Sequence, residues 1–287
     1  MRPKNLRTKI FLDSFNPEET KEIISLLGFL DGQTTNPNQV PEYPYVRERF
    51  LKGDKFTKEE IYDFYKKVII EISKLIPDGS VSAEVYADEN TTSEQIYSQA
   101  KEMFQWIPNA HIKYPIIPAG LEAAERGLKE GIRANLTLCF NQEQAAAVYS
   151  ATKGAKKGDV FLSPFFGRLE DIGVNGITLI KNIIEMYKKG DGHVEMLSAS
   201  IRNVNQLMAA IALGSDNITA KFSVLKEWGE MGMPIPDEKF VYDSGSLRDI
   251  IFKEIDLEKS WDEYDISDDM TNKGLKQFVT NWNSLIK

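Results

Sequence analysis

A chain of 287 residues with 42% hydrophobic and 27% charged side chains has the size and composition of one large globular domain, a length that α/β barrels commonly reach. The formal net charge of -8 disfavours broad electrostatic binding of nucleic acid or anionic membranes, so we expect neither as a partner. A single cysteine rules out an internal disulfide, and the lack of a long apolar run or a signal peptide pattern predicts a cytoplasmic protein.

Short β-rich apolar runs alternate with longer amphipathic runs along most of the chain. The pattern predicts eight strands, at 9–13, 32–36, 80–85, 111–116, 133–139, 159–165, 194–200 and 217–222. It predicts helices at 17–28, 57–76, 92–106, 119–130, 142–153, 175–189, 203–213 and 223–231. Strict alternation indicates a parallel sheet, and eight units favour a closed (β/α)8 TIM barrel. The alternative, an open doubly wound sheet, lacks support because no GxGxxG motif follows the first strand.

Helix start and stop signals support these boundaries. Asn16 before Pro17 supplies an N-cap and a proline at the first helical position, and Thr57 with Glu60 is typical of a capping box. Gly28 follows the first helix, where a left-handed residue is favoured.

Two segments fall outside the eight units. Residues 38–56 are expected to form an irregular loop or short helix, and 275–286 form an amphipathic run that we expect to pack on the barrel or reach over its mouth. The predicted organisation is therefore a catalytic barrel, 1–231, and a C-terminal helical extension, 232–287, that packs on it.

Polar residues occur at the C-terminal ends of the predicted strands, which is where barrel enzymes build their active sites. Their convergence on one end of the barrel is hard to explain by packing alone. They are Asp13, Thr35 and Asn36, Glu84, Lys113, Asn135 and Thr137, Ser163 with Arg168 just beyond, and Ser200 with Arg202.

Lys113 is the centre of the functional hypothesis. It lies inside a predicted parallel strand, where burial is usual and disfavours the charged ammonium form. A neutral amine is the form that attacks a carbonyl group. The alternative is a strand-end lysine that reaches solvent or pairs with a carboxylate.

Asp13 and Glu84 are the candidate proton carriers for such chemistry. One would act as the base at a sugar hydroxyl, and the other would work through a water held by Thr137. The alternatives are that Asp13 caps the first helix and that Glu84 forms an ion pair with Lys113, which is compatible with catalysis.

Arg168, Ser200 and Arg202 form a candidate anion site, since guanidinium groups suit phosphate oxygens. The alternative is that both arginines are solvated surface residues. Metal binding is disfavoured because His111 and His193 are the only histidines, although an all-carboxylate Mg²⁺ site stays open.

We interpret two further residues as structural, and we expect no cofactor. His111 is expected in the core or at the bottom face of the barrel. Cys139 is expected to be a buried small side chain.

The residues resemble the transaldolase family, including the fructose-6-phosphate aldolases. The resemblance rests on the motifs DGQTTNP (31–37), AEV (83–85), IKYP (112–115), NLTL (135–138), SPFFGR (163–168) and SASIRN (198–203). It implies that Lys113 forms a Schiff base, assisted by Asp13, Glu84 and Thr137. It also implies substrate contacts from Asn36, Asn135 and Ser163, with Thr35 and Phe165 beside them, and a phosphate site of Arg168, Ser200 and Arg202.

Two positions favour the transaldolase branch of this family. Transaldolases carry a glutamate on the third strand and a phenylalanine after Ser-Pro on the sixth, which match Glu84 and Phe165. The resemblance therefore implies transfer of a dihydroxyacetone unit from a ketose phosphate, such as fructose 6-phosphate, to an aldose phosphate.

Three alternatives stay open at this point. They are an aldolase that releases free dihydroxyacetone, a transaldolase for a ketose with another terminal anion such as a sulfonate, and a sugar-phosphate-binding barrel without catalysis. The oligomeric state is open, a homo-oligomer included.

Overall fold

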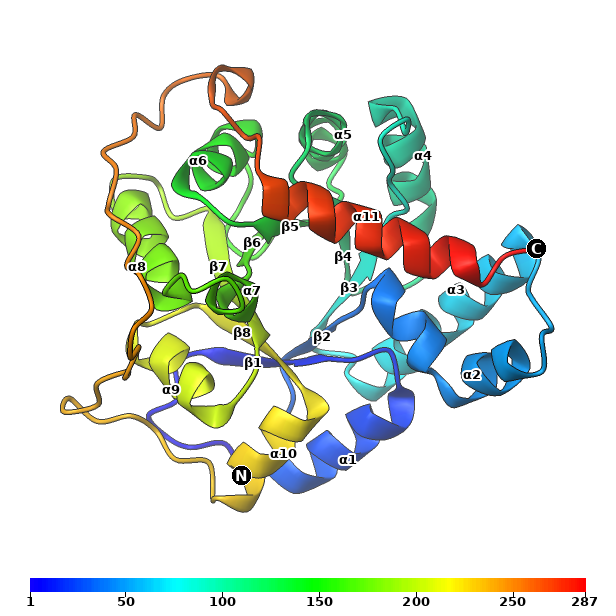
Figure 1. The fold of residues 1–287 in the computed structure, drawn as a ribbon, viewed down its shortest axis with the longest axis horizontal. Coiled ribbons are helices and arrows are strands. Elements are labelled where there is room, and N and C mark those ends of the chain that lie inside the picture. The colour runs from blue at the N-terminus through cyan, green and yellow to red at the C-terminus, as the bar shows by residue number, and fades with distance from the viewer.

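Eight parallel strands close into a barrel in the computed structural model, which describes residues 1–287 (Figure 1). Each strand pairs with its neighbour in chain order, and β8 pairs with β1, which confirms the predicted (β/α)8 fold. The strands are β1 (Lys9–Asp13), β2 (Gly32–Thr34), β3 (Ser80–Glu84), β4 (Ala110–Pro115), β5 (Ala134–Cys139), β6 (Val160–Pro164), β7 (Val194–Ile201) and β8 (Asn217–Lys221).

Eight helices surround the barrel, one after each strand or its loop. They are α1 (Pro17–Leu27), α3 (Lys58–Leu75), α4 (Ser93–Phe104), α5 (Pro118–Lys129), α6 (Gln142–Ala151), α8 (Gly176–Tyr187), α9 (Val204–Ala212) and α10 (Phe222–Glu230). The predicted signals are confirmed, because Asn16 caps α1, Thr57 and Glu60 form a capping box, and Gly28 has a φ of 77°. None of the helices combines the length and apolar character needed to cross a bilayer.

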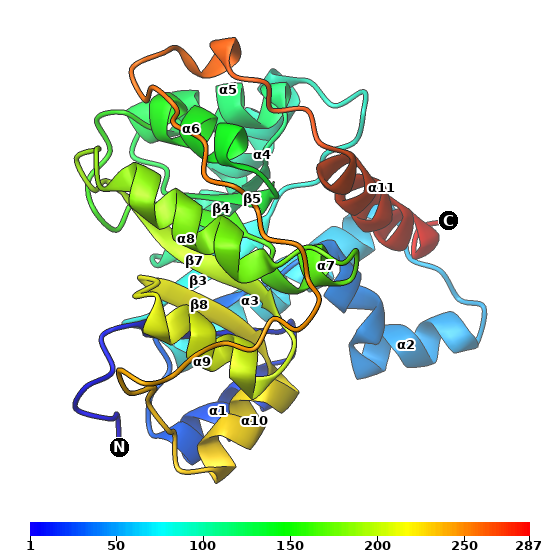
Figure 2. The ribbon, with the colours of Figure 1, turned by 60° about the vertical axis from the view of Figure 1, so that its left-hand side comes forward.

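The second strand is shorter than predicted. Asn36 does not continue it, because its side chain accepts a hydrogen bond from the backbone N–H of Asn38 while Gln39 bonds back to the backbone N–H of Asn36. This capping box starts η1 (Pro37–Glu42), and α2 (Pro44–Leu51) follows and projects beyond the barrel (Figure 2). Of the two forms expected for 38–56, an irregular loop or a short helix, the short helix is confirmed.

A short helix after β6, α7 (Phe166–Glu170), was not predicted. Five residues are too few to produce a helical hydrophobic period in the sequence. The helix matters for the site because it carries Arg168.

The residues after α10 run back along the outside of the barrel. Side chains of the outer helices hold this segment through its backbone: Asn182 of α8 bonds Ile250, and Gln142 of α6 bonds Lys253. After η2 (Trp261–Glu263) the chain turns into α11 (Asp269–Ser284), which crosses the mouth of the barrel (Figures 1 and 2). This helix begins six residues earlier than predicted because Asp268 caps it.

The lower part of the barrel interior is closed by aromatic packing. Phe11, Phe161 and Leu197 form a small buried cluster separate from the main core. His111 stacks on Phe161 with ring centroids 4.2 Å apart, and its two ring nitrogens face Ser80 Oγ and the backbone oxygen of Gly158. Burial lowers the pKa of His111 from 6.5 to about 3. His111 is thus both buried and close to the bottom of the barrel, as expected.

The buried neutral imidazole predicts a loss of stability in mild acid. The unfolded chain takes up a proton at His111 below about pH 6.5, whereas the folded chain does not until about pH 3, so falling pH favours unfolding. Between pH 7 and pH 5 this contribution is on the order of 2 kcal/mol. Measured by urea unfolding, the free energy of unfolding should fall less between pH 7 and pH 5 for His111→Gln than for the parent protein. Equal falls in the two proteins would contradict the assignment of His111 as a buried neutral imidazole.

Candidate active site

A cavity of about 760 Å³ opens at the C-terminal ends of the strands. Most of the predicted site residues line it: Asp13, Asn36, Lys113, Thr137, Ser163, Phe165, Arg168, Ser200 and Arg202. Three others, Thr35, Glu84 and Asn135, lie behind its wall and support the residues that face it. Strand order and register bring most of these side chains together from across the chain.

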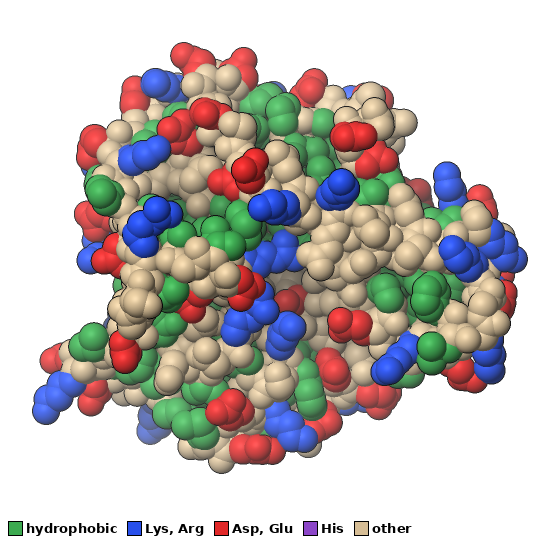
Figure 3. Space-filling model, in the orientation of Figure 1, with side chains coloured by type: hydrophobic (Ala, Val, Ile, Leu, Met, Phe, Trp, Pro, Cys, Tyr) green, Lys and Arg blue, Asp and Glu red, His purple; other side chains and the backbone are tan.

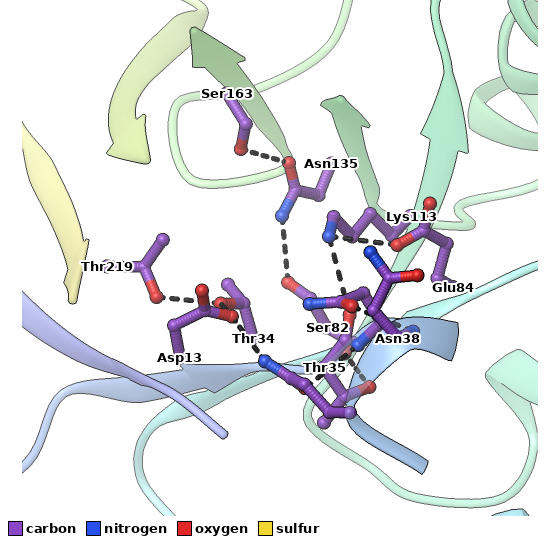
Figure 4. Close-up of polar contacts among 12 residues, drawn as sticks. Asp13, Thr34, Thr35, Asn38, Ser82, Glu84, Lys113, Asn135, Ser163 and Thr219 are labelled. Atoms are coloured by element: carbon purple, nitrogen blue, oxygen red, sulfur yellow. Dashed lines mark hydrogen bonds and ion pairs between the residues drawn. The ribbon is translucent and has the colours of Figure 1, made fainter. Parts of the chain in front are cut away.

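Lys113 and Glu84 form a buried ion pair. They are register partners on β4 and β3, so their side chains point to the same side of the sheet, and Lys113 Nζ lies 2.9 Å from Glu84 Oε2 (Figure 4). Both side chains are at most 5% exposed. The amine also donates to the backbone oxygen of Thr35 at 3.4 Å. Lys113 therefore does not reach solvent, and the pairing with a carboxylate that we considered is present.

Burial raises the pKa of Glu84, and the neighbouring Lys113 offsets only part of that effect. A carboxyl group in this environment holds a proton more readily than an exposed one. The phenyl ring of Phe278, on α11, lies near the amine, with its centroid 5.9 Å from Lys113 Nζ.

Asp13 is held at the end of β1 by two hydrogen bonds. Its Oδ1 accepts from Gln39 Nε2 at 2.7 Å and from Thr34 Oγ1 at 3.2 Å, and Thr34 in turn shares a 2.7 Å bond with Thr219 Oγ1. Asp13 does not cap α1, because Asn16 does. We did not identify Gln39, Thr34 or Thr219 from sequence, although Thr219 is a polar residue inside an apolar strand and could have been found on that ground.

A chain of hydrogen bonds fixes the wall beside the lysine. Ser163 Oγ donates to Asn135 Oδ1 at 2.7 Å, and Asn135 Nδ2 donates to Ser82 Oγ at 3.0 Å (Figure 4). Thr137 Oγ1, the neighbour of Ser163 in register, is buried, lines the cavity and has no hydrogen-bond partner in the protein. This hydroxyl is free to bond a substrate or a water.

Thr35 lies differently from what we expected of a substrate contact. Its hydroxyl donates to the backbone oxygen of Ser82 at 2.9 Å and bonds the Tyr65 hydroxyl at 2.9 Å. Only its backbone oxygen faces Lys113. The side chain therefore supports the site from behind.

Two strands are bulged where they meet the cavity. Leu138 on β5 and Ser200 on β7 have φ values of 65° and 61°, and the sheet register shifts at both places. Left-handed backbone at residues other than glycine costs about 1–3 kcal/mol, and bulges commonly re-aim side chains at active sites. Here they turn the ends of β5 and β7 at the rim.

Arg168 and Arg202 lie on one side of the cavity. The Arg168 guanidinium lies 5.1 Å from the ring centroid of Phe165 and 5.6 Å from that of Phe278. Burial and then the nearby Arg202 lower the pKa of Arg168, which nonetheless stays charged. Arg202 is more exposed and pairs with Asp171 at 2.7 Å.

Gly167 allows the strand β7 and helix α7 to approach closely. A Cβ at this position would lie 2.3 Å from the backbone oxygen of Ser200 and 2.6 Å from Arg202 Cγ. The glycine is therefore required for Ser200 and Arg202 to share one wall with Arg168.

The inner face of α11 forms the roof of the cavity. Its residues recur at helical spacing along one stripe, which sequence analysis did not resolve: Met270, Lys273, Gly274, Gln277, Phe278 and Asn281. Thr271 Oγ1 donates to the backbone oxygen of Leu138 at 2.8 Å, and Asn281 Nδ2 donates to Asn38 Oδ1 at 2.8 Å. The helix is thus tied down on both sides of the mouth.

Charge is unevenly distributed around the mouth. Lys and Arg side chains gather beside the central hollow on the face shown in Figure 3. Among the lining residues, Lys113, Arg168, Arg202, Lys221 and Lys273 are cationic. No group of three or more His, Cys, Asp or Glu side chains is arranged to hold a metal ion.

Comparison with known proteins gives a consistent picture. The family model described as Transaldolase/Fructose-6-phosphate aldolase matches residues 10–287. A probable transaldolase from Dehalococcoides mccartyi is 37% identical over 229 residues, which cover 80% of this chain and 93% of that protein. Probable transaldolases from Roseiflexus sp. and Leptospira biflexa are 35% and 34% identical over 82% and 83% of this chain, and over 96% and 98% of their own.

The close packing of α11 predicts the effect of one substitution. A Cβ at Gly274 would lie 2.6 Å from Leu138 Cδ2 and 2.8 Å from Arg168 Nη1. Leu138 is fully buried and has little room to move aside, so Gly274→Ala should displace the helix from the mouth. We expect amide hydrogen exchange across 269–284 to speed up by about tenfold, a loss of roughly 1.4 kcal/mol of local stability.

Asn272→Ala is the matched control, because Asn272 is exposed on the same helix. It should leave the exchange rates unchanged. Unchanged exchange in Gly274→Ala would show that α11 is not held by this contact.

Proposed function

Because the chain belongs to the transaldolase/fructose-6-phosphate aldolase family, we propose that it is a transaldolase that holds its ketose donor as a Schiff base on Lys113. The observation that carries the proposal is the buried Lys113–Glu84 pair, 2.9 Å apart, at a cavity that Asp13 and Thr137 also line. A buried amine next to a carboxyl of raised pKa is suited to attack on a carbonyl group.

The first half of the reaction forms the covalent intermediate. Once its ammonium proton has passed to Glu84, Lys113 Nζ attacks C2 of the ketose and gives a carbinolamine. Glu84 then returns a proton to the C2 hydroxyl, which leaves as water, and the iminium ion remains. The free hydroxyl of Thr137 would hold the water that relays this proton.

The second half breaks and remakes a carbon–carbon bond. Asp13 takes the proton of the C4 hydroxyl, the C3–C4 bond breaks, and its electron pair moves to the iminium nitrogen to give an enamine. The aldose phosphate leaves. The enamine carbon attacks the aldehyde of an acceptor, Asp13 returns its proton to the new hydroxyl, and water releases the ketose product from Lys113.

Arg168, Ser200 and Arg202 would bind the terminal phosphate of donor and acceptor, with fructose 6-phosphate as the first donor to test. Ser163 would contact the sugar hydroxyls together with Asn36, and Asn135 would hold the Ser163 hydroxyl in place from behind the wall. The proposal of a transferase rather than an aldolase rests on Glu84 and Phe165, the two residues that resemble the transaldolase branch.

Borohydride trapping tests the nucleophile directly. With fructose 6-phosphate, we expect a reduced three-carbon adduct on Lys113, located by peptide mass spectrometry, because cleavage leaves the dihydroxyacetone unit on the lysine. Lys113→Ala should give no adduct, whereas Lys153→Ala, which replaces an outer lysine paired with Glu258, should react as the parent does.

Three other outcomes would change the proposal. An adduct elsewhere would exclude Lys113 as the nucleophile. Free dihydroxyacetone formed at the transfer rate without an acceptor would favour an aldolase. No adduct with phosphorylated, sulfonated and unsubstituted ketoses would favour a binding protein without turnover.

Replacing the proposed base should separate Schiff-base formation from cleavage. Asp13→Asn cannot accept the C4 hydroxyl proton, so we expect transfer to slow by about 10²–10⁴-fold while an uncleaved six-carbon adduct accumulates on Lys113. Asp63→Asn, on the exposed side of α3, is the control and should behave as the parent protein. A three-carbon adduct formed at the normal rate in Asp13→Asn would assign the base to another residue.

A further inference from the structure

Hydrogen bonds to neighbouring elements fix the position of α11, the helix that forms the roof of the cavity. Asp268 caps its first turn and is itself held by Asn141 Nδ2 at 3.1 Å. Gln144 Nε2 bonds Thr271 Oγ1 at 2.7 Å, and that hydroxyl also reaches Leu138. The residues on its inner face therefore stand at fixed places relative to strand β5 and helix α6.

Lys273 stands on this inner face next to Gly274, where an added Cβ would lie 2.8 Å from Arg168 Nη1. One turn further along, Gln277 Oε1 accepts a hydrogen bond from Arg168 Nη2 at 3.4 Å. Helix geometry puts positions 273 and 277 on the same side, so Lys273 lies on the side of α11 that faces the Arg168 guanidinium.

The ion pairs of the cavity leave Lys273 available. Arg202 is engaged by Asp171 at 2.7 Å, whereas Lys273 takes part in no ion pair of the molecule. The charges of Arg168, Arg202 and Asp171 sum to one net positive charge for an incoming anion. Lys273 raises that net charge to two, which matches a phosphate monoester, close to a dianion at neutral pH.

The other charged residues of the rim lie elsewhere. Lys221 is the register partner of Asp13, so it belongs to the β1 side of the mouth. Glu19 and Glu42 line the cavity from α1 and η1 and would repel an anion there. The cationic wall formed by Arg168, Arg202 and Lys273 is thus the one favourable end for a terminal anion.

We propose that Lys273 is a substrate-binding residue that α11 adds to this wall, and that it selects sugars whose terminal group is a phosphate dianion over those with a monoanionic terminal group. The proposal rests on the proposed function and deepens it. Lys273 is a specificity-determining residue for the terminal anion and takes no part in the covalent chemistry at Lys113.

The test is calorimetric titration of the full chain with inorganic phosphate and, in parallel, with methanesulfonate. Lys273→Gln should weaken phosphate binding by about tenfold and methanesulfonate binding by less, because the lost charge matters most for a dianion. Lys273→Arg should restore phosphate binding. Lys276→Gln is the matched control, an exposed lysine of α11 outside the cavity lining, and should change neither affinity by more than about twofold.

Two results would overturn the proposal. The first is that Lys273→Gln binds phosphate as tightly as the parent protein does. The second is that Lys276→Gln loses as much phosphate affinity as Lys273→Gln, which would show that only the total charge of the helix matters. Because these titrations need no turnover, they are independent of the Lys113 adduct. A missing adduct with the expected phosphate effect would reject the Schiff-base proposal alone, whereas an adduct without that effect would reject the role of Lys273.

Discussion

The buried ion pair between Lys113 and Glu84 constrains how the residues around it are arranged. Bringing Lys113 and Glu84 out of water is costly, and the cost is offset only when both partners are held in good geometry. The barrel provides that geometry, because β3 and β4 place the two residues opposite each other in register. Neighbouring polar groups are hydrogen-bonded: the Tyr65 hydroxyl accepts from the backbone N–H of Glu84, and Ser163 donates to Asn135. The Thr137 hydroxyl, in contrast, has no partner.

The site is assembled in two layers that come from different parts of the chain. The strands supply Lys113, Thr137 and the carboxylates, and their positions follow from barrel closure. The roof comes from a helix that reaches the mouth only after its connecting segment has passed α8 and α6. Phe278 joins the layers, since its ring lies near both Lys113 and Arg168.

Sequence reasoning succeeded where structure is repetitive and failed where it depends on long-range packing. Most of the strands were predictable because they are short apolar runs, although β2 (Gly-Gln-Thr) is not. Their polar end residues were predictable because parallel strands present the same ends to one mouth. Gln39 was not predicted as a site residue because its hydrogen bond to Asp13 depends on the capping box that begins η1. The inner face of α11 escaped notice because nothing local indicates which strands a distant helix will cover.

The left-handed residues Leu138 and Ser200 have a consequence for heat tolerance. Each holds a backbone conformation that an L-amino acid adopts at a cost, and both stand where the strands bend around the cavity. Glycine or asparagine would relax these positions and raise the melting temperature, yet it would also loosen the rim that shapes the cavity. A substitution at Leu138 or Ser200 that raises the melting temperature should therefore lower the turnover rate. Variants selected for thermal stability should show this stability–activity trade-off first at these two positions.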